Sequence, residues 1–285
     1  PVATLDPAAP ERPDDAAARP SPSQATEAPA SQVRATEALA PASAPAQAGA
    51  SVAAAPAEAD TAPARPPREL SAPARVMIPP PARLRYRVEA NKFPFVLSSE
   101  LLWQHDGRDY ATRLSFSAFG QSRVQTSRGQ LDEDGLRPVR FSDRTRSEVA
   151  AHFNRAQGRV MFSANTPDAP LLAGAQDRLS VLLQLGALLA GEPARYPAAS
   201  TLTIQTIGPR DADTWLFTVD ATETLELPGG TLQAVRLVRN PRKEFDQRVE
   251  IWLAPAQAYL PVRVRITDPN GDRVDQLWLG TESPS

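Results

Sequence analysis

Residues 176–189 read QDRLSVLLQLGALL, and this stretch decides how the rest of the chain is interpreted. It contains six leucines and no proline, and Gly191 and Pro193 follow it as a helix stop. Apolar residues cover most of the circumference of the helix predicted for Gln176 to Leu189, so this helix should be buried. A buried helix needs a surrounding layer of secondary structure, and the flanking sequence predicts that layer.

The residues on both sides of this stretch alternate between apolar and polar, which is typical of half-buried β-strands. The turn sequences Asp134-Gly135 and Asn270-Gly271 supply the positive-φ positions that hairpins need. We therefore predict an all-β domain at residues 83–282, in which a curved antiparallel sheet or open half barrel of about twelve strands encloses one buried helix. The alternation is clearest at 84–88, 114–118, 201–205, 215–219 and 262–267.

The first 82 residues differ from the rest of the chain in composition. They hold seventeen of the thirty prolines and none of the seventeen Trp, Tyr and Phe residues. Such a segment cannot bury enough apolar area to offset its ordering entropy, so we predict a disordered Pro/Ala-rich linker at residues 1–82. The chain begins at Pro1 rather than Met. We expect a periplasmic domain that is tethered to the inner membrane by a segment upstream of Pro1.

The charge balance and the absence of cysteine exclude several classes of function. The formal net charge is -2 and the pI is about 5.9, so we expect no nucleic acid as a partner. Without cysteine the chain has no disulfide, zinc–thiolate site or thiol nucleophile. We also expect a monomer that contacts a membrane only through the upstream anchor. A basic cluster is interpreted as the solvated face of a strand: Arg236, Arg239, Arg242 and Lys243.

Catalytic and metal-binding motifs are mostly missing. The two histidines are His105, in a predicted turn, and His152, in a predicted strand, and a Ser-His-Asp hydrolase would need one of them. No Gly-x-Ser-x-Gly elbow, His-Glu-x-x-His motif, phosphate-binding loop or dinucleotide fingerprint occurs. Residues 268–272 have the spacing of a calcium loop, but Arg273 stands where that loop needs glycine. The acidic residues 132–134 are interpreted as a solvated turn. We therefore predict no enzyme activity, no metal and no cofactor.

The candidate site residues are Gln176, Asp177 and Arg178, at the beginning of the predicted helix. One interpretation makes Asp177 an N-terminal cap, because a carboxylate there accepts backbone N–H bonds and complements the helix dipole. The other places all three residues at the mouth of a groove, where they hold the head group of a ligand. The residues favour the cap and leave the groove open as the alternative.

Five short segments carry a resemblance to a known family: Ser127-Arg128-Gly129, Gly135-Leu136-Arg137-Pro138, Gln176-Asp177-Arg178-Leu179-Ser180, Val249-Glu250-Ile251-Trp252-Leu253 and Leu260-Pro261-Val262-Arg263. Together they resemble the domain of unknown function 3108 family, which occurs in exported bacterial proteins. The resemblance implies an envelope-associated, β-rich domain and supplies no catalytic residues. In architecture alone, the predicted fold is similar to the lipoprotein-carrier half barrels, whose sheet and helix enclose an apolar groove.

Three functions are compatible with the sequence. The preferred hypothesis is a non-catalytic binding or assembly module of the cell envelope, which holds a lipid or a lipoprotein acyl chain in an apolar groove. The second is a structural scaffold that docks onto another envelope protein or onto peptidoglycan. The third is a hydrolase that uses His152. A filled core would favour the scaffold, with all four tryptophans inside it: Trp103, Trp215, Trp252 and Trp278.

Overall fold

The computed structural model describes residues 74–118 and 121–284, which belong to the unit Pro63–Ser285. Most of the linker predicted for residues 1–82 therefore lies outside the described residues, up to residue 73. None of the helices formed within the described ranges has the length and apolar character needed to cross a bilayer.

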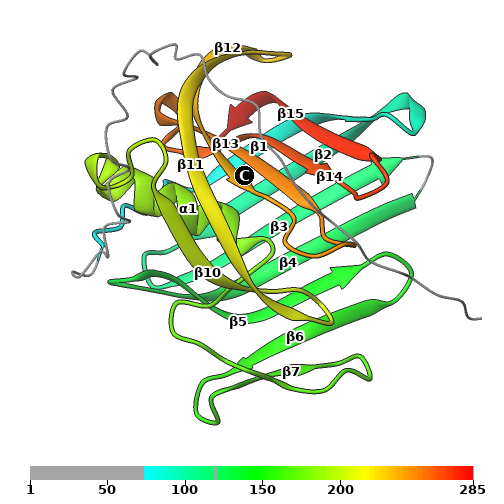
Figure 1. The fold of residues 1–285 in the computed structure, drawn as a ribbon, viewed down its shortest axis with the longest axis vertical. Helices are drawn as coiled ribbons and strands as arrows, with labels where there is room; N and C mark the ends of the chain where they lie inside the picture. Colours follow the sequence, from blue (N-terminus) through cyan, green and yellow to red (C-terminus); the bar gives the residue numbers. More distant parts are fainter. Residues whose placement is uncertain (1–73, 119–120, 285) are drawn as a thin grey trace, which may run out of the picture. The chain divides into compact units, whose positions relative to one another are not determined.

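Fifteen strands of the described residues form one sheet (Figure 1). Twelve of them have seven residues or more, and the three short strands β7, β8 and β9 bring the number above the expected twelve. The strands are β1 (Ala82–Ala90), β2 (Phe93–His105), β3 (Asp109–Ala118), β4 (Gln121–Asp132), β5 (Gly135–Arg144), β6 (Glu148–Asn154), β7 (Arg159–Phe162), β8 (Ala169–Pro170), β9 (Gln176–Asp177), β10 (Thr201–Ile207), β11 (Ala212–Leu227), β12 (Gly230–Arg239), β13 (Arg248–Ala254), β14 (Leu260–Thr267) and β15 (Arg273–Glu282).

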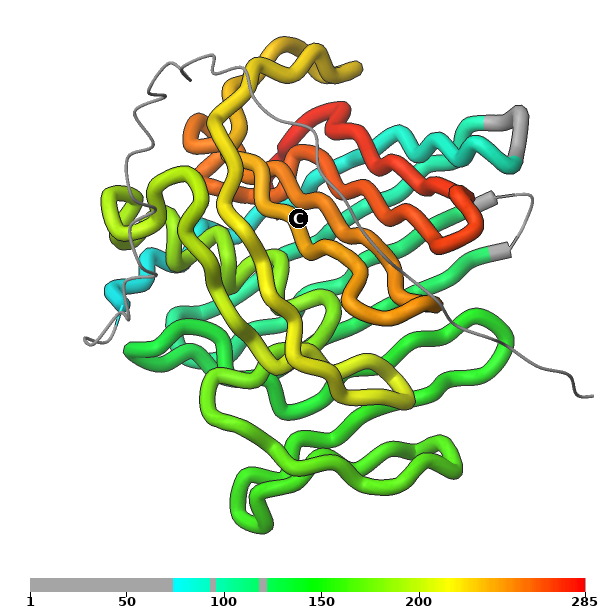
Figure 2. The backbone as a smooth tube through the Cα atoms, viewed as in Figure 1, coloured from blue at the N-terminus to red at the C-terminus, as the bar shows by residue number. Residues whose placement is uncertain are grey.

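The strand order shows a chain of hairpins that returns to its starting point. It runs β8-β7-β6-β5-β4-β3-β2-β1-β15-β14-β13-β12-β11-β10-β9, so most sequence neighbours are also neighbours in the sheet. The first and last strands, β1 and β15, pair antiparallel and lie side by side in Figure 2. The all-β prediction and the antiparallel hairpins are confirmed.

The two edge strands, β8 and β9, do not pair with each other in the described sheet, so it is a curved open sheet rather than a closed barrel. The gap between them, which we call the open seam, is bridged by the side chain of Gln205 on β10. Its Oε1 accepts the Leu172 N–H at 2.8 Å, and its Nε2 donates to the Pro170 carbonyl at 2.8 Å. Side-chain hydrogen bonds therefore replace a backbone ladder at the open seam.

The helix α1 spans Ser180–Gly191 and is followed by the short 3-10 helix η1 (Pro193–Arg195), while a second, η2 (Pro255–Gln257), precedes β14. The predicted helix start at Gln176 is wrong by four residues. Gln176 and Asp177 instead form β9, which pairs in parallel with the end of β10. Pairing with a strand about thirty residues away competes with the local preference for helix. Nine of the twelve helix residues are buried, as the sequence predicted.

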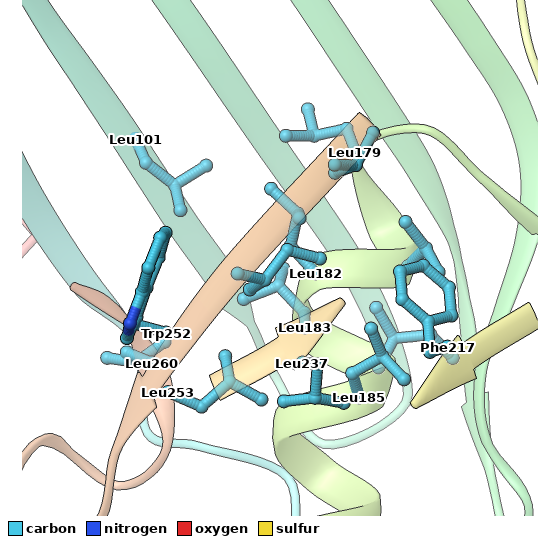
Figure 3. Close-up of a cluster of buried hydrophobic side chains, with 14 of the residues drawn as sticks. Leu101, Leu179, Leu182, Leu183, Leu185, Phe217, Leu237, Trp252, Leu253 and Leu260 are labelled. Atoms are coloured by element: carbon cyan, nitrogen blue, oxygen red, sulfur yellow. The ribbon is translucent and has the colours of Figure 1, made fainter. Parts of the chain in front are cut away.

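The interior between α1 and the sheet is filled with apolar side chains (Figure 3). Leucines of α1 point toward side chains from strands on both sides, among them Phe217 on β11 and Trp252 on β13. All four tryptophans are buried, with at most 8% of each exposed. The labelled members of this cluster are Leu101, Leu179, Leu182, Leu183, Leu185, Phe217, Leu237, Trp252, Leu253 and Leu260.

Residues 75–79, which precede β1, lie against the folded unit. The Met77 N–H donates to the Ala187 carbonyl of α1 at 2.9 Å. The indole Nε1 of Trp103 donates to the Pro79 carbonyl at 2.9 Å. The last residues of the predicted linker therefore share hydrogen bonds with the helix and with β2.

The basic cluster near the end of β12 differs from the expected solvated face. Arg239 is only 3% exposed, its Nη2 lies 2.6 Å from an Asp246 carboxylate oxygen, and its guanidinium lies 4.6 Å from the Trp215 ring centroid. The interpretation as a solvated residue is wrong for Arg239, because the Asp246 carboxylate in the β12–β13 loop and the Trp215 ring on β11 cover its charge. Two members of the cluster are exposed: Arg242 and Lys243.

Candidate functional site

A polar pocket of about 330 Å³ lies beside the open seam. Three parts of the chain line it: the β4–β5 turn with the start of β5, the β6–β7 turn, and residues 171–175 that connect β8 to β9. The loop 171–175 joins the two edge strands of the sheet, so the pocket lies where the sheet stays open. Its charged and amide side chains are Asp132, Asp134, Arg137, Arg155 and Gln176.

Arg155 is the half-buried cation of this pocket. Its Nη1 donates to the Pro138 carbonyl at 2.9 Å, and its guanidinium lies 5.8 Å from the Phe153 ring centroid. Burial, reinforced by the positive charge of Arg137, lowers the pKa of Arg155. No carboxylate of residues 74–118 or 121–284 lies within ion-pair distance of it. The nearby Arg137 is different, because Asp132 lies 3.7 Å from it.

Gln176 forms the inner wall of the pocket. Its side chain is 1% exposed, and its Nε2 donates to the Leu136 carbonyl at 2.6 Å. Its Oε1 is buried and has no hydrogen-bond partner among the described residues. A second amide, Gln184 on α1, accepts the Leu136 N–H at 2.7 Å and donates to the Asp134 carbonyl at 2.8 Å. Two glutamines therefore hold the start of β5 against β9 and α1.

Behind Gln176 lies a buried chain of hydrogen bonds centred on Asp177, which is 0% exposed. Its Oδ1 accepts the backbone N–H groups of Leu179 and Ser180 at 2.9 and 2.7 Å. Its Oδ2 accepts the hydroxyl of Ser127 on β4 at 2.5 Å, and the Tyr110 hydroxyl lies 3.0 Å from that of Ser127. Burial raises the pKa of Asp177 to about 6, against the lowering effect of the Ser127 hydrogen bond. Burial and the negative charge of Asp177 also raise the pKa of Tyr110.

The structure separates the three candidate residues of the sequence. Gln176 lines the pocket, and Asp177 lies behind it on β9, where its carboxylate accepts the N–H groups of Leu179 and Ser180. The N-cap position of α1 is Leu179, which has no side-chain cap. Arg178 points to the β10–β11 turn, where its Nη2 lies 2.8 Å from an Asp211 carboxylate oxygen. Sequence reasoning missed Arg155 completely. Its only local signal is the turn that ends at Gly158, which predicts a hairpin and not a site.

The other motifs considered in the sequence form no catalytic or metal centre in the described residues. The His105 Nε2 lies 3.0 Å from the Pro79 carbonyl, and His152 is exposed on β6 without a hydrogen bond to any described residue. Residues 268–272 form the β14–β15 hairpin turn, in which Asp272 pairs with Lys92 at 3.0 Å. No group of three or more His, Asp or Glu side chains in the described ranges could hold a metal ion.

Three of the five motif segments meet at this site. Ser127 donates to Asp177, and the backbone of Leu136 is held by Gln176 and Gln184. The fold and these contacts together define the class of domain: a curved open sheet packed around one helix, with a polar pocket beside its seam. The chain belongs to the family "Protein of unknown function (DUF3108)", whose sequence model matches residues 85–277. No curated protein matches the chain.

Several solved structures are similar to the chain at low sequence identity. A β-barrel-like protein of the domain of unknown function DUF1849 from Brucella abortus has 12% identity and a TM-score of 0.49, over 74% of this chain and 100% of that one. MucB has 12% identity and a TM-score of 0.27, over 72% of this chain and 55% of that one. A protein from Bacteroides fragilis named as exported, with a YmcC-like fold, has 10% identity and a TM-score of 0.29, over 74% and 100%. None of these likenesses indicates what the present chain binds.

Proposed function

We propose that the chain is a non-catalytic binding or assembly module of the cell envelope, which engages its partner at the polar pocket beside the open seam. The proposal keeps the envelope role expected from the sequence and moves the binding site out of the interior. We place the site at the pocket because the space around α1 is filled with side chains.

An acyl chain in the interior would have to displace side chains that already pack there. Leu183 and Leu185 of α1 are at most 1% exposed, and Trp252 on the facing strand is 2% exposed. Re-exposing one such side chain costs about 1.5–3 kcal/mol, and an acyl chain would displace several. The pocket offers polar groups at the surface without any rearrangement of the core. A packed core with four buried tryptophans supports a scaffold over a carrier.

Two features support the envelope part of the proposal. The first is the Pro/Ala-rich composition of residues 1–82, which suits a tether that spans a distance rather than a folded domain. The second is the family, because the sequence resemblance implies that its members occur in exported bacterial proteins. The non-catalytic part is supported by the histidines, since neither has a hydrogen bond or ion pair to a serine or a carboxylate among the described residues.

Photocrosslinking in the native host tests the proposal. A photoreactive residue at position 137, on the pocket rim, should yield a discrete adduct with an envelope component. The same residue at position 113, exposed on β3, is the matched control and should not. Adducts of equal yield at both positions, or none at position 137, would contradict binding at the pocket. Lipid extraction of the full chain provides the second readout, because one bound acyl chain per protein would restore the carrier hypothesis.

A further inference from the structure

The pocket beside the open seam contains two groups that the described residues leave unsatisfied. One is the guanidinium of Arg155, which lacks a carboxylate within ion-pair distance although it donates to the Pro138 carbonyl. The other is the Oε1 atom of Gln176, which lacks a hydrogen-bond donor. Each of these two groups favours a different kind of ligand atom. The inference drawn from them rests on the proposed function, because it names the ligand of the same pocket.

The guanidinium of Arg155 favours an anionic ligand. A guanidinium that is half buried loses hydration, and it usually regains that energy from a carboxylate or phosphate in a two-pronged contact. Here Nη1 already donates to the Pro138 carbonyl, and no carboxylate of the described residues lies within ion-pair distance, although Asp132 and Asp134 line the same pocket. The neighbouring Arg137 differs from Arg155 in having an ion-pair partner, Asp132 at 3.7 Å.

The Oε1 atom of Gln176 favours a ligand with a hydrogen-bond donor. Its amide orientation is set by the 2.6 Å bond from Nε2 to the Leu136 carbonyl, so Oε1 faces away from that partner. A buried amide oxygen without a donor costs about 1–3 kcal/mol, which a ligand N–H recovers on binding. A bare carboxylate or phosphate ion has no N–H to offer.

We propose that the pocket binds the end of a peptide with a free carboxylate. The terminal carboxylate lies against Arg155, and the N–H of the last peptide bond donates to the Oε1 of Gln176. The carboxylate of Asp134 at the rim disfavours dianions such as phosphate esters, because it adds a repulsive charge. A pocket of 330 Å³ suits the last one or two residues, since each extended residue spans about 3.3–3.6 Å.

The test titrates the full chain with acetyl-trialanine and with its C-terminal amide, following the backbone amide NMR signals of Gly174 and Ala175. The free acid should shift these pocket signals, and the amide should bind about tenfold or more weakly because it lacks the charge for Arg155. A third probe, in which an ester oxygen replaces the last N–H, should bind about threefold or more weakly than the acid. These three probes use the unmodified protein, so no variant needs to fold.

Two variants complete the experiment. Arg155→Gln should abolish the preference for acid over amide, while the matched control Arg113→Gln on β3 should keep it. A protein C-terminus and the stem peptide of peptidoglycan share this chemistry, and acids ending in L- or D-alanine separate the two sources. Equal binding of acid and amide, or no shift with either probe at about 10 mM, overturns the inference. The crosslinking result at position 137 stands independently of that outcome.

Discussion

Replacing Asp177 by asparagine should remove a large pH dependence from the stability of the domain. The carboxylate is completely buried, and its pKa is raised from 3.8 to about 6. Asparagine has nearly the same shape and cannot ionise. Its Oδ1 can accept the N–H groups of Leu179 and Ser180, and its Nδ2 can donate to the hydroxyl of Ser127, which now donates to Tyr110.

The sign follows from the direction of the shift. A carboxyl group with a raised folded-state pKa stabilises the fold at low pH, where it is protonated in both states, and this contribution is lost as the pH rises through 6. The whole shift corresponds to about 3 kcal/mol. Between about pH 4.5 and 7.5, roughly 2 kcal/mol of it should be lost from the wild-type protein and none from Asp177→Asn.

Urea unfolding at several pH values measures this difference, with the fluorescence of the buried tryptophans as the signal. The other carboxylates are the same in both proteins, so their contributions cancel when the two free energies of unfolding are subtracted. The wild-type protein should gain stability relative to Asp177→Asn as the pH falls. A difference that stays constant between about pH 4.5 and 7.5 would show that Asp177 titrates normally and that the argument from burial is wrong.

Three further substitutions test the packing by the same unfolding assay. Leu183→Ala on α1 should lower the free energy of unfolding by about 2–5 kcal/mol because it opens a cavity in a filled core, and a loss below 1 would indicate a loose interior. Gly135→Ala should cost about 1–3 kcal/mol, since Gly135 has φ of +107° and a Cβ would meet the amide of Gln184; a neutral result would refute the close contact. Arg239→Met should cost about 2–3 kcal/mol by leaving Asp246 unpaired, and an unchanged midpoint would return Arg239 to the solvated face expected from the sequence.

Much of the fold could be predicted because the relevant signals are local. Alternation over a few residues identified β1, β10 and β14, and glycines such as Gly271, with φ of +85°, marked the hairpin turns. The helix was found from its leucines, but its start was not. Residues 176 and 177 become a strand only because β10 offers a partner, and this pairing leaves no trace in the local sequence.

The site divides in the same way. Gln176 stands in a stretch that the sequence singled out, and it does line the pocket. Arg155 could not be predicted from the sequence, because it follows a strand with no unusual feature. It lies near Gln176 only because β5 pairs with β6. Asp177 accepts two backbone N–H groups, as the cap interpretation expected, but it does so from β9, three residues before α1. Its burial depends on β4 lying against β9, which the cap pattern does not predict.

The sequence by itself determined that strands, hairpin turns and one apolar helix would form, because these follow from side-chain periodicity over a few residues. Tertiary structure alone decided that the sheet stays open between β8 and β9, that the interior is filled, and that Arg155 and Gln176 share a pocket. These features depend on contacts between residues far apart in the chain. Their free energies come from burial and pairing, which exist only after the strands have assembled.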